Sequence, residues 1–198
     1  MIKLLIFDVG GVIIDYSEDD YIRYISDKFG LDFKKLAMAL NPLVKEMDYG
    51  WTKVSYVESK LSRMFNIPKL DLEWISAYKK LSKLDTKVAN FVLKLSRRYR
   101  TVMMSNISIT RYLESKQLFL YKFKRCRTFA SCYLHMRKPE RRMYLYVLEK
   151  MNVKPEEALF IDNMQENVDG ARKAGIKSIR FTSYAQLVRA LKKYGVSA

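Results

Sequence analysis

The chain has 198 residues, 49% hydrophobic and 29% charged, a balance that excludes wholesale disorder and allows one buried core with a small accessory module. Its 37 Lys and Arg against 21 Asp and Glu give a formal net charge of +16, which favours anionic partners. Because most basic pairs fall on what look like exposed helix faces, a solvated surface is the default explanation and nucleic-acid binding is the less favoured one.

The first fourteen residues, MIKLLIFDVGGVII, resemble a secretory leader, but Asp8 interrupts the apolar run and no small-residue cleavage site is present. No later stretch approaches the roughly 18 apolar residues that a membrane span needs. The cysteines, Cys126 and Cys132, lack the spacing of zinc ligands and are expected to be reduced and packed, although a disulfide between them is possible. We therefore predict a cytoplasmic protein with no membrane contact.

Residues 3–7 form an apolar run that predicts a buried strand, followed by a tight turn at Gly10 and Gly11. From residue 16 to about 83, apolar residues recur at helical spacing with almost no strand signal. This block predicts about four amphipathic helices, punctuated at Asn41-Pro42 and Ile67-Pro68.

After a helix start at Asp85-Thr86, helices and strands alternate to the end of the chain. The expected helices cover 88–99, 109–118, 139–151 with Pro139 at its first position, 165–175 and 184–195. The expected strands cover 101–105, 127–130, 157–162 and 177–181. This alternation predicts an α/β fold with a parallel sheet covered on both faces and an all-helical insertion.

Ligands of such sheets bind beyond the carboxyl ends of the strands. Six polar residues fall at or near those ends: Asp8, Ser105, Asn106, Lys138, Asp162 and Asn163. Taken singly, each has an ordinary explanation: Asp8 as a turn cap, Ser105-Asn106 as a helix cap, Lys138 as a surface lysine. Taken together and in this order, they predict a site for a metal ion and a phosphate centred on Asp8.

Four stretches carry a family resemblance: FDVGGVIID, VMMSN, MRKPERRMY and LFIDNMQENVDGARKAGI. In this order they resemble the motifs of the haloacid dehalogenase-like hydrolase superfamily, in its helical-cap branch, whose members are mostly phosphatases. The resemblance implies a Rossmann-like core from residues 1–15 and 84–198, with an inserted all-helical cap from residues 16–83.

The resemblance also implies roles for individual residues. Asp8 is the expected nucleophile, attacking phosphorus to form an aspartyl-phosphate, and Lys138 is expected to neutralise the developing charge. The expected phosphate-binding residues are Gly10, Gly11, Ser105 and Asn106. The expected ligands of a Mg²⁺ cofactor are Asp8, the carbonyl of Gly10, and Asp162 or Asn163. The implied substrate is a small phosphorylated metabolite, and the implied assembly is a monomer or a homodimer.

Two departures from the family pattern leave alternatives open. Gly10 stands where the phosphatases usually carry a second Asp, the general acid and base, although some branches with this DxG motif are described as hydrolases. Asn163 replaces a usual metal-binding acid, and Asp15 is a candidate substitute for the missing Asp. A catalytically weakened or inactive phosphate-ligand or partner-binding protein is therefore the alternative. A true haloacid dehalogenase fits less well because those enzymes usually carry Tyr at the position of Gly10.

Four further side chains have two interpretations each. His135, the only histidine, either contacts substrate or faces solvent on a loop, and the loop position is favoured. Tyr49, Trp51 and Tyr56 either line the site from the cap or belong to the cap core.

Overall fold

The computed structural model describes residues 1–68 and 70–198. Five parallel strands form its central sheet in the order β5-β4-β1-β6-β7. These strands are β1 (Leu4–Phe7), β4 (Arg100–Ser105), β5 (Arg127–Ala130), β6 (Ala158–Asp162) and β7 (Lys177–Arg180). The strand that opens the chain is therefore central, paired in register with β4 on one side and β6 on the other.

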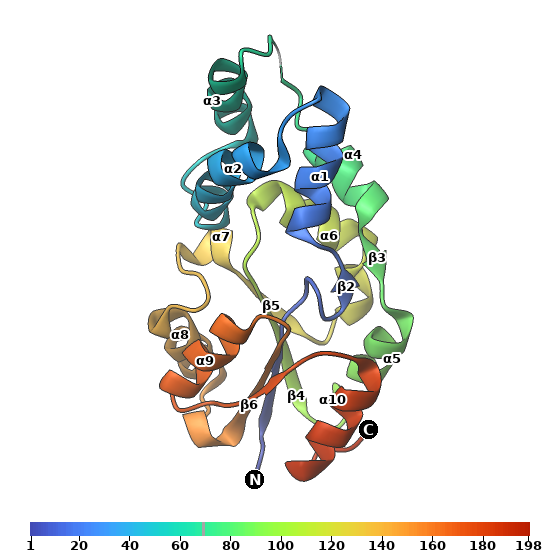
Figure 1. Ribbon diagram of the computed structural model, residues 1–198. Helices are drawn as coiled ribbons and strands as arrows, with labels where there is room; N and C mark the ends of the chain where they lie inside the picture. Colours follow the sequence, from blue (N-terminus) through green and yellow to red (C-terminus); the bar gives the residue numbers. More distant parts are fainter. Residues whose placement is uncertain (69) are drawn as a thin grey trace.

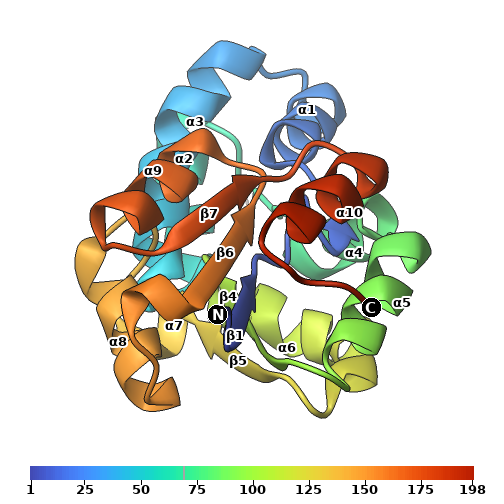
Figure 2. The same cartoon turned by 90° about the horizontal axis from the view of Figure 1, so that it is seen from below.

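Both faces of the sheet are buried, as expected for parallel strands joined through helices. Leu4 and Ile6 of β1 belong to one hydrophobic cluster, whereas Leu5 and Phe7 belong to another on the opposite face. Helices α8 (Arg141–Met151) and α9 (Gln165–Lys173) cover the first face (Figures 1 and 2). Helices α5 (Thr86–Leu95) and α10 (Tyr184–Lys193) cover the second.

Four helices form a separate layer beyond the carboxyl ends of the strands, far from both chain termini (Figure 1). They are α1 (Glu18–Phe29), α2 (Phe33–Asp48), α3 (Val54–Phe65) and α4 (Trp74–Leu81), and their buried side chains form a hydrophobic cluster of their own. Where the chain enters and leaves this layer, β2 (Ile14–Asp15) pairs antiparallel with β3 (Lys83–Leu84). The Rossmann-like core with an inserted helical cap is thus confirmed, while the domain boundaries at 15/16 and 83/84 remain predictions.

Short elements complete the core. They are α6 (Ile109–Leu118), α7 (Ser131–Leu134), and the 3₁₀ turns η1 (Leu120–Phe123) and η2 (Pro155–Glu157). Both cysteines are buried free thiols. Among the described residues, no helix combines the length and apolar character needed to cross a bilayer.

Two proline-based predictions were wrong. Pro42 does not interrupt the cap, because α2 runs through it from Phe33 to Asp48. Pro139 is not the first residue of α8, because Glu140 adopts an extended conformation and caps a helix that begins at Arg141. In both places the local preference of proline does not decide where the helix runs.

Candidate active site

Asp8 lies directly beyond the carboxyl end of the central strand, only 6% exposed. Its backbone N–H donates to the carbonyl of Ile161 on the neighbouring β6, at 2.9 Å. This bond continues the hydrogen bonding between β1 and β6 for one more residue. Its Oδ1 accepts a hydrogen bond from the N–H of Val9, at 2.7 Å. The carboxylate is therefore held by the sheet rather than by a flexible loop.

Lys138 lies between two carboxylates. Its Nζ is 2.7 Å from Oδ1 of Asp8 and 2.7 Å from Oδ2 of Asp162. The side chain is 1% exposed, which excludes the surface-lysine interpretation. The side chain of Asn106 fixes the backbone of Lys138, accepting from its N–H and donating to its carbonyl, each at 2.8 Å.

This buried triad perturbs the titration of its members. Burial and the adjacent Asp162 raise the pKa of Asp8 to about 7, against the opposing effect of Lys138. Burial disfavours the charged form of Lys138, but the two carboxylates outweigh it and hold the pKa of Lys138 above its usual value. Lys138 is therefore the stable positive charge of the site.

Asp162 is completely buried, and both of its oxygens are occupied. Oδ1 accepts from the N–H of Met164 at 2.8 Å, and Oδ2 accepts from Lys138. The amide of Asn167, in the first turn of α9, donates to both oxygens at 3.1 and 3.0 Å. Sequence reasoning missed Asn167, although an Asn five residues after an Asp at a strand end was a visible signal. Asp162 thus positions Lys138 and has little capacity left for a metal ion.

Asn163 is better placed as a metal ligand. Its Oδ1 is buried and has no hydrogen-bond partner among the described residues. Its side chain packs against Gly11, where the backbone is left-handed (φ +75°) and an added Cβ would lie 2.3 Å from Nδ2 of Asn163. An unpartnered amide oxygen is a type of donor that Mg²⁺ takes, and Asn163 lines the same cavity as the Asp8 carboxylate, so the two residues fit the implied ion.

The loop after β4 forms another part of the surface around Asp8. Ser105 is 5% exposed and lines the same cavity as Asp8. The alternative interpretation of Ser105-Asn106 as a helix cap is wrong, because Ser108 caps α6 and its side chain accepts from the N–H of Arg111. The N–H of Ile107 is taken by Oγ of Ser131, at 2.9 Å, a second contact that the sequence did not reveal.

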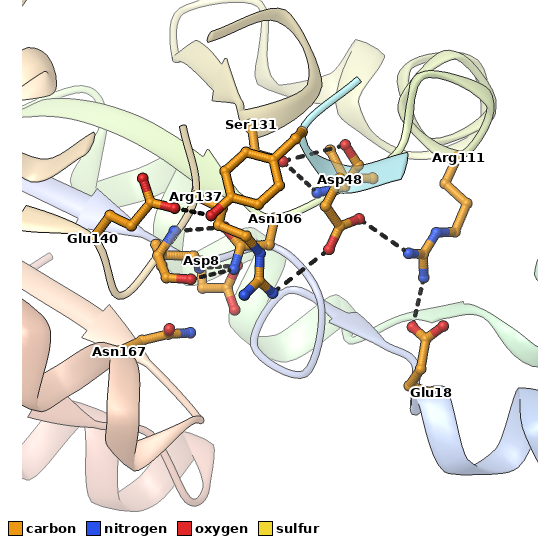
Figure 3. Close-up of polar contacts among 12 residues, drawn as sticks. Asp8, Glu18, Asp48, Asn106, Arg111, Ser131, Arg137, Glu140 and Asn167 are labelled. Carbon is orange, nitrogen blue, oxygen red and sulfur yellow. Dashed lines mark hydrogen bonds and ion pairs between the residues drawn. The ribbon is translucent and has the colours of Figure 1, made fainter. Parts of the chain in front are cut away.

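A charged network joins the cap to the core above this wall (Figure 3). Arg111 of α6 is buried, and its guanidinium donates to Glu18 at 2.7 Å and to Asp48 at 3.3 Å, both on cap helices. Asp48 also lies 3.7 Å from Arg137, the neighbour of Lys138 in the chain. Burial raises the pKa of Asp48 to about 6, although Arg111 and Arg137 oppose this shift. None of these four residues was predicted from the sequence.

The cap and the core enclose a cavity of about 360 Å³ with Asp8 at its base. Its lining is largely polar and comes from both layers: Asp8, Gly10, Tyr16, Glu18, Asn41, Val44, Lys45, Asp48, Ser105, Asn106, Arg111, Arg137, Lys138, Asn163, Met164, Glu166 and Asn167. Gly11 and Asp15 line a different hollow, so the structure does not bring Asp15 to Asp8.

Tyr49, Trp51 and Tyr56, the three cap aromatics considered from the sequence, lie outside this cavity, whereas Tyr16 lines it. Trp51 is 63% exposed and Tyr56 is 48% exposed, so neither lines the cavity nor belongs to the cap core. Tyr49 stacks on Trp51, and its carbonyl lies 2.7 Å from Nδ1 of His135, which is exposed as expected. These residues connect the end of α2 to the loop before Lys138.

Known proteins share the sequence pattern and the fold of this chain. A family model described as haloacid dehalogenase-like hydrolase matches residues 2–175, and the chain belongs to that family. Flavin mononucleotide hydrolase 1 of Arabidopsis thaliana is 26% identical over 99% of this chain and 79% of its own length. A HAD family enzyme from Bacteroides thetaiotaomicron, solved with magnesium and inorganic phosphate, superposes with a TM-score of 0.78 and 21% identity, covering 94% of this chain and 99% of that one.

A shorter match concerns bifunctional epoxide hydrolase 2 of Rattus norvegicus, which is 36% identical over 63 residues. That match covers 32% of this chain and only 11% of the relative.

Proposed function

We propose that this hydrolase is a magnesium-dependent phosphatase that acts on a small phosphorylated metabolite through an aspartyl-phosphate on Asp8. The observation that carries the proposal is the position of Asp8, at the base of a polar cavity with its carboxylate 2.7 Å from the buried ammonium of Lys138. An ordered carboxylate beside a fixed cation is suited to attack a phosphoryl group and to balance its charge.

In the first step an oxygen of Asp8 forms a bond to phosphorus while the bond to the ester oxygen breaks. Lys138 balances the charge on the transferring group, and the hydroxyl of Ser105 is the proposed donor to a phosphoryl oxygen. In the second step water displaces Asp8 from phosphorus and releases inorganic phosphate. Gly10 offers no carboxyl group to protonate the leaving oxygen, so we expect a modest rate.

Asp8, the carbonyl of Gly10 and Asn163 are the proposed ligands of Mg²⁺, which when bound reduces the repulsion between the carboxylate and the phosphate ester. The buried, unpartnered Oδ1 of Asn163 supports this assignment within this chain. The magnesium and phosphate reported with the Bacteroides structure support it by analogy of fold.

The cavity volume of about 360 Å³ and its polar lining favour a small hydrophilic ester. The name of the Arabidopsis relative also supports a phosphate ester as substrate, and flavin mononucleotide is therefore a reasonable test compound. A cytoplasmic location and a monomeric or homodimeric state are further parts of the proposal.

The alternative is a protein that binds a phosphorylated ligand or a partner without turning it over. Gly10 favours it, because the proposed nucleophile then lacks the usual second carboxylate, and Asp15 does not line the same cavity.

One assay separates the two. Release of inorganic phosphate from an aryl phosphate and from flavin mononucleotide is measured with Mg²⁺ and with EDTA, for the wild type and Asp8→Asn. Metal-dependent release that Asp8→Asn abolishes supports the phosphatase. Calorimetric binding of inorganic phosphate without release from either ester supports the binding protein.

A further inference from the structure

The positive charge of this chain is concentrated in one part of the sequence. Residues 86–138 contain thirteen Lys and Arg and a single acid, Glu114, so this stretch carries +12 of the net +16. Arg111, Arg137 and Lys138 belong to the site described above. The other ten basic residues are all exposed: Lys87, Lys94, Arg97, Arg98, Arg100, Lys116, Lys122, Lys124, Arg125 and Arg127.

This charge has no counterpart in the part of the chain that the structure describes. None of the ten side chains forms an ion pair with a described acidic residue, and Glu114 is already engaged by Lys79 of the cap, at 3.2 Å. A dispersed, solvated surface usually intersperses both signs of charge. An unopposed patch of one sign instead indicates a polyanionic partner.

Two adjacent hollows lie within this patch, with volumes of about 510 and 660 Å³. Five cations line them: Arg97, Lys116, Lys122, Lys124 and Arg125, with no acid in either lining. Tyr121 and Lys124 line both hollows, and Tyr121 is 52% exposed between the cations. Leu113, 48% exposed, adds apolar surface to the second hollow. The two hollows therefore form a continuous basic groove with an accessible aromatic ring at its centre.

The groove is distinct from the active site. It shares no lining residue with the Asp8 cavity. Its central element, η1, leads into the amino end of β5, and Arg97 precedes the amino end of β4. Asp8 lies beyond the carboxyl end of β1, whereas the groove runs along α6 and η1 beside the edge strand β5.

We propose that this groove, defined by Arg97, Lys116, Tyr121, Lys122, Lys124 and Arg125, binds a single-stranded nucleic acid. Cations along a groove contact successive phosphates, and an exposed tyrosine offers a face on which a base stacks. A duplex presents no unstacked base to Tyr121, and a flat lipid surface does not match a hollowed one. The observations thus favour a single strand over both, and the proposal does not depend on the phosphatase activity.

The test is fluorescence anisotropy with labelled single-stranded RNA and single-stranded DNA of mixed sequence, between about 50 and 200 mM salt. The patch variant carries Lys122→Gln, Lys124→Gln and Arg125→Gln. The matched control carries Lys34→Gln, Lys192→Gln and Lys193→Gln, which remove the same charge from exposed positions elsewhere. Thermal melting and circular dichroism establish that all variants are folded, whether or not the protein hydrolyses a phosphate ester.

We expect the patch variant to bind about tenfold or more weakly than the wild type. Its salt slope should fall by about 2, because each phosphate contact on a single strand contributes about 0.7. The control should stay within about twofold, and Tyr121→Ala should weaken binding about fivefold or more through lost stacking. The relative affinities for RNA and DNA identify which strand is preferred.

Three results would overturn the proposal. The first is no binding at the lowest salt. The second is an equal loss in the patch variant and the control, which would mean a general charge effect. The third is binding to vesicles containing phosphatidylserine, or to duplex, that exceeds binding to both single strands.

Discussion

At the scale of single residues, the site depends on one cation placed between two buried carboxylates. Lys138 contacts Asp8 and Asp162 at 2.7 Å each, and it is almost completely shielded from water. Such an arrangement is stable only as a set, because each buried charge needs its partner.

Lys138→Met should therefore destabilise the fold by about 3–5 kcal/mol, since it leaves two carboxylates buried without a counter-ion. Urea unfolding of this variant is compared with Lys150→Met, where an exposed lysine lies 3.8 Å from Glu149 and its loss should cost under about 0.5 kcal/mol. Equal stabilities for the two variants would contradict the buried-triad description.

Gly10 allows the missing carboxylate to be restored. A Cβ added at Gly10 meets no atom within 4 Å, and Gly10 lines the Asp8 cavity. If a general acid is what the site lacks, Gly10→Asp should raise kcat for an aryl phosphate by about tenfold or more. Gly10→Asn is the matched control, because it adds the same volume without an acid. Equal rates in the Asp and Asn variants would show that the acid is not limiting.

At the scale of elements, the end of α2 is one of the contacts between cap and core, beside the larger contact of α4 with α6. Gly50 has φ +71°, and a Cβ there would lie 2.2 Å from the carbonyl oxygen of Cys132. Cys132 belongs to α7 of the core. Gly30, at the end of α1, has a similar φ of +64° but nothing within 4 Å of an added Cβ. Comparing alanine substitutions at Gly50 and Gly30 therefore separates the cost of backbone strain from the cost of disturbing the contact between cap and core.

Both alanine variants should lose about 1 kcal/mol of unfolding free energy, because alanine is strained in the left-handed backbone conformation. Gly50→Ala should lose a further 1–3 kcal/mol, roughly, because α2 must move away from α7. It should also raise KM for an aryl phosphate, whereas Gly30→Ala should leave KM unchanged. The measurements are urea unfolding and steady-state kinetics, and matching values for the two variants would argue against this docking contact.

The carboxylate of Asp48 gives the same interface a pH dependence. Its pKa rises from 3.8 to about 6 in the folded state because burial disfavours the charge. The folded chain thus binds this proton more tightly than the unfolded chain, and the stability that it contributes is present below about pH 4 and is lost as pH rises to about 6.

Relative to Asp48→Asn, which does not titrate, the wild type should lose about 3 kcal/mol of unfolding free energy between pH 4 and pH 7. Urea unfolding of both proteins at the two pH values measures this difference, and other titrating groups cancel in the comparison. A wild type that gains stability over the variant as pH rises would mean that the ion pairs with Arg111 and Arg137 outweigh burial.

Local patterns were sufficient to predict most elements. Residues 109–118 and 127–130 form the expected helix and strand, because their patterns depend on near neighbours. Pro42 misled the prediction because the helix around it is held by the buried side chains of Leu40, Leu43 and Val44, while Pro42 itself is exposed. Pro139 misled it because this proline packs closely against Gly170, which lies far along the chain. Asp8, Ser105 and Lys138 were found because parallel strands bring their carboxyl ends to one edge.

At the scale of the whole molecule, the features that escaped prediction are those between layers. Arg111 meets Asp48 and Glu18 across 63 and 93 residues of sequence, and no local pattern encodes such a pairing. The uneven charge is a similar case. The sequence shows a basic stretch over residues 86–138, but only the fold shows that five of its exposed cations line two adjoining hollows with no acid in their lining.

Covalent capture determines whether Asp8 carries the phosphoryl group during turnover. The protein is mixed with an acyl phosphate in the presence of Mg²⁺, quenched in acid and digested, and the peptide containing Asp8 is analysed by mass spectrometry. We predict a phosphate on Asp8 that EDTA prevents and that Asp8→Asn lacks. Phosphate release that continues in Asp8→Asn, or a phosphate found on another residue, would contradict the account.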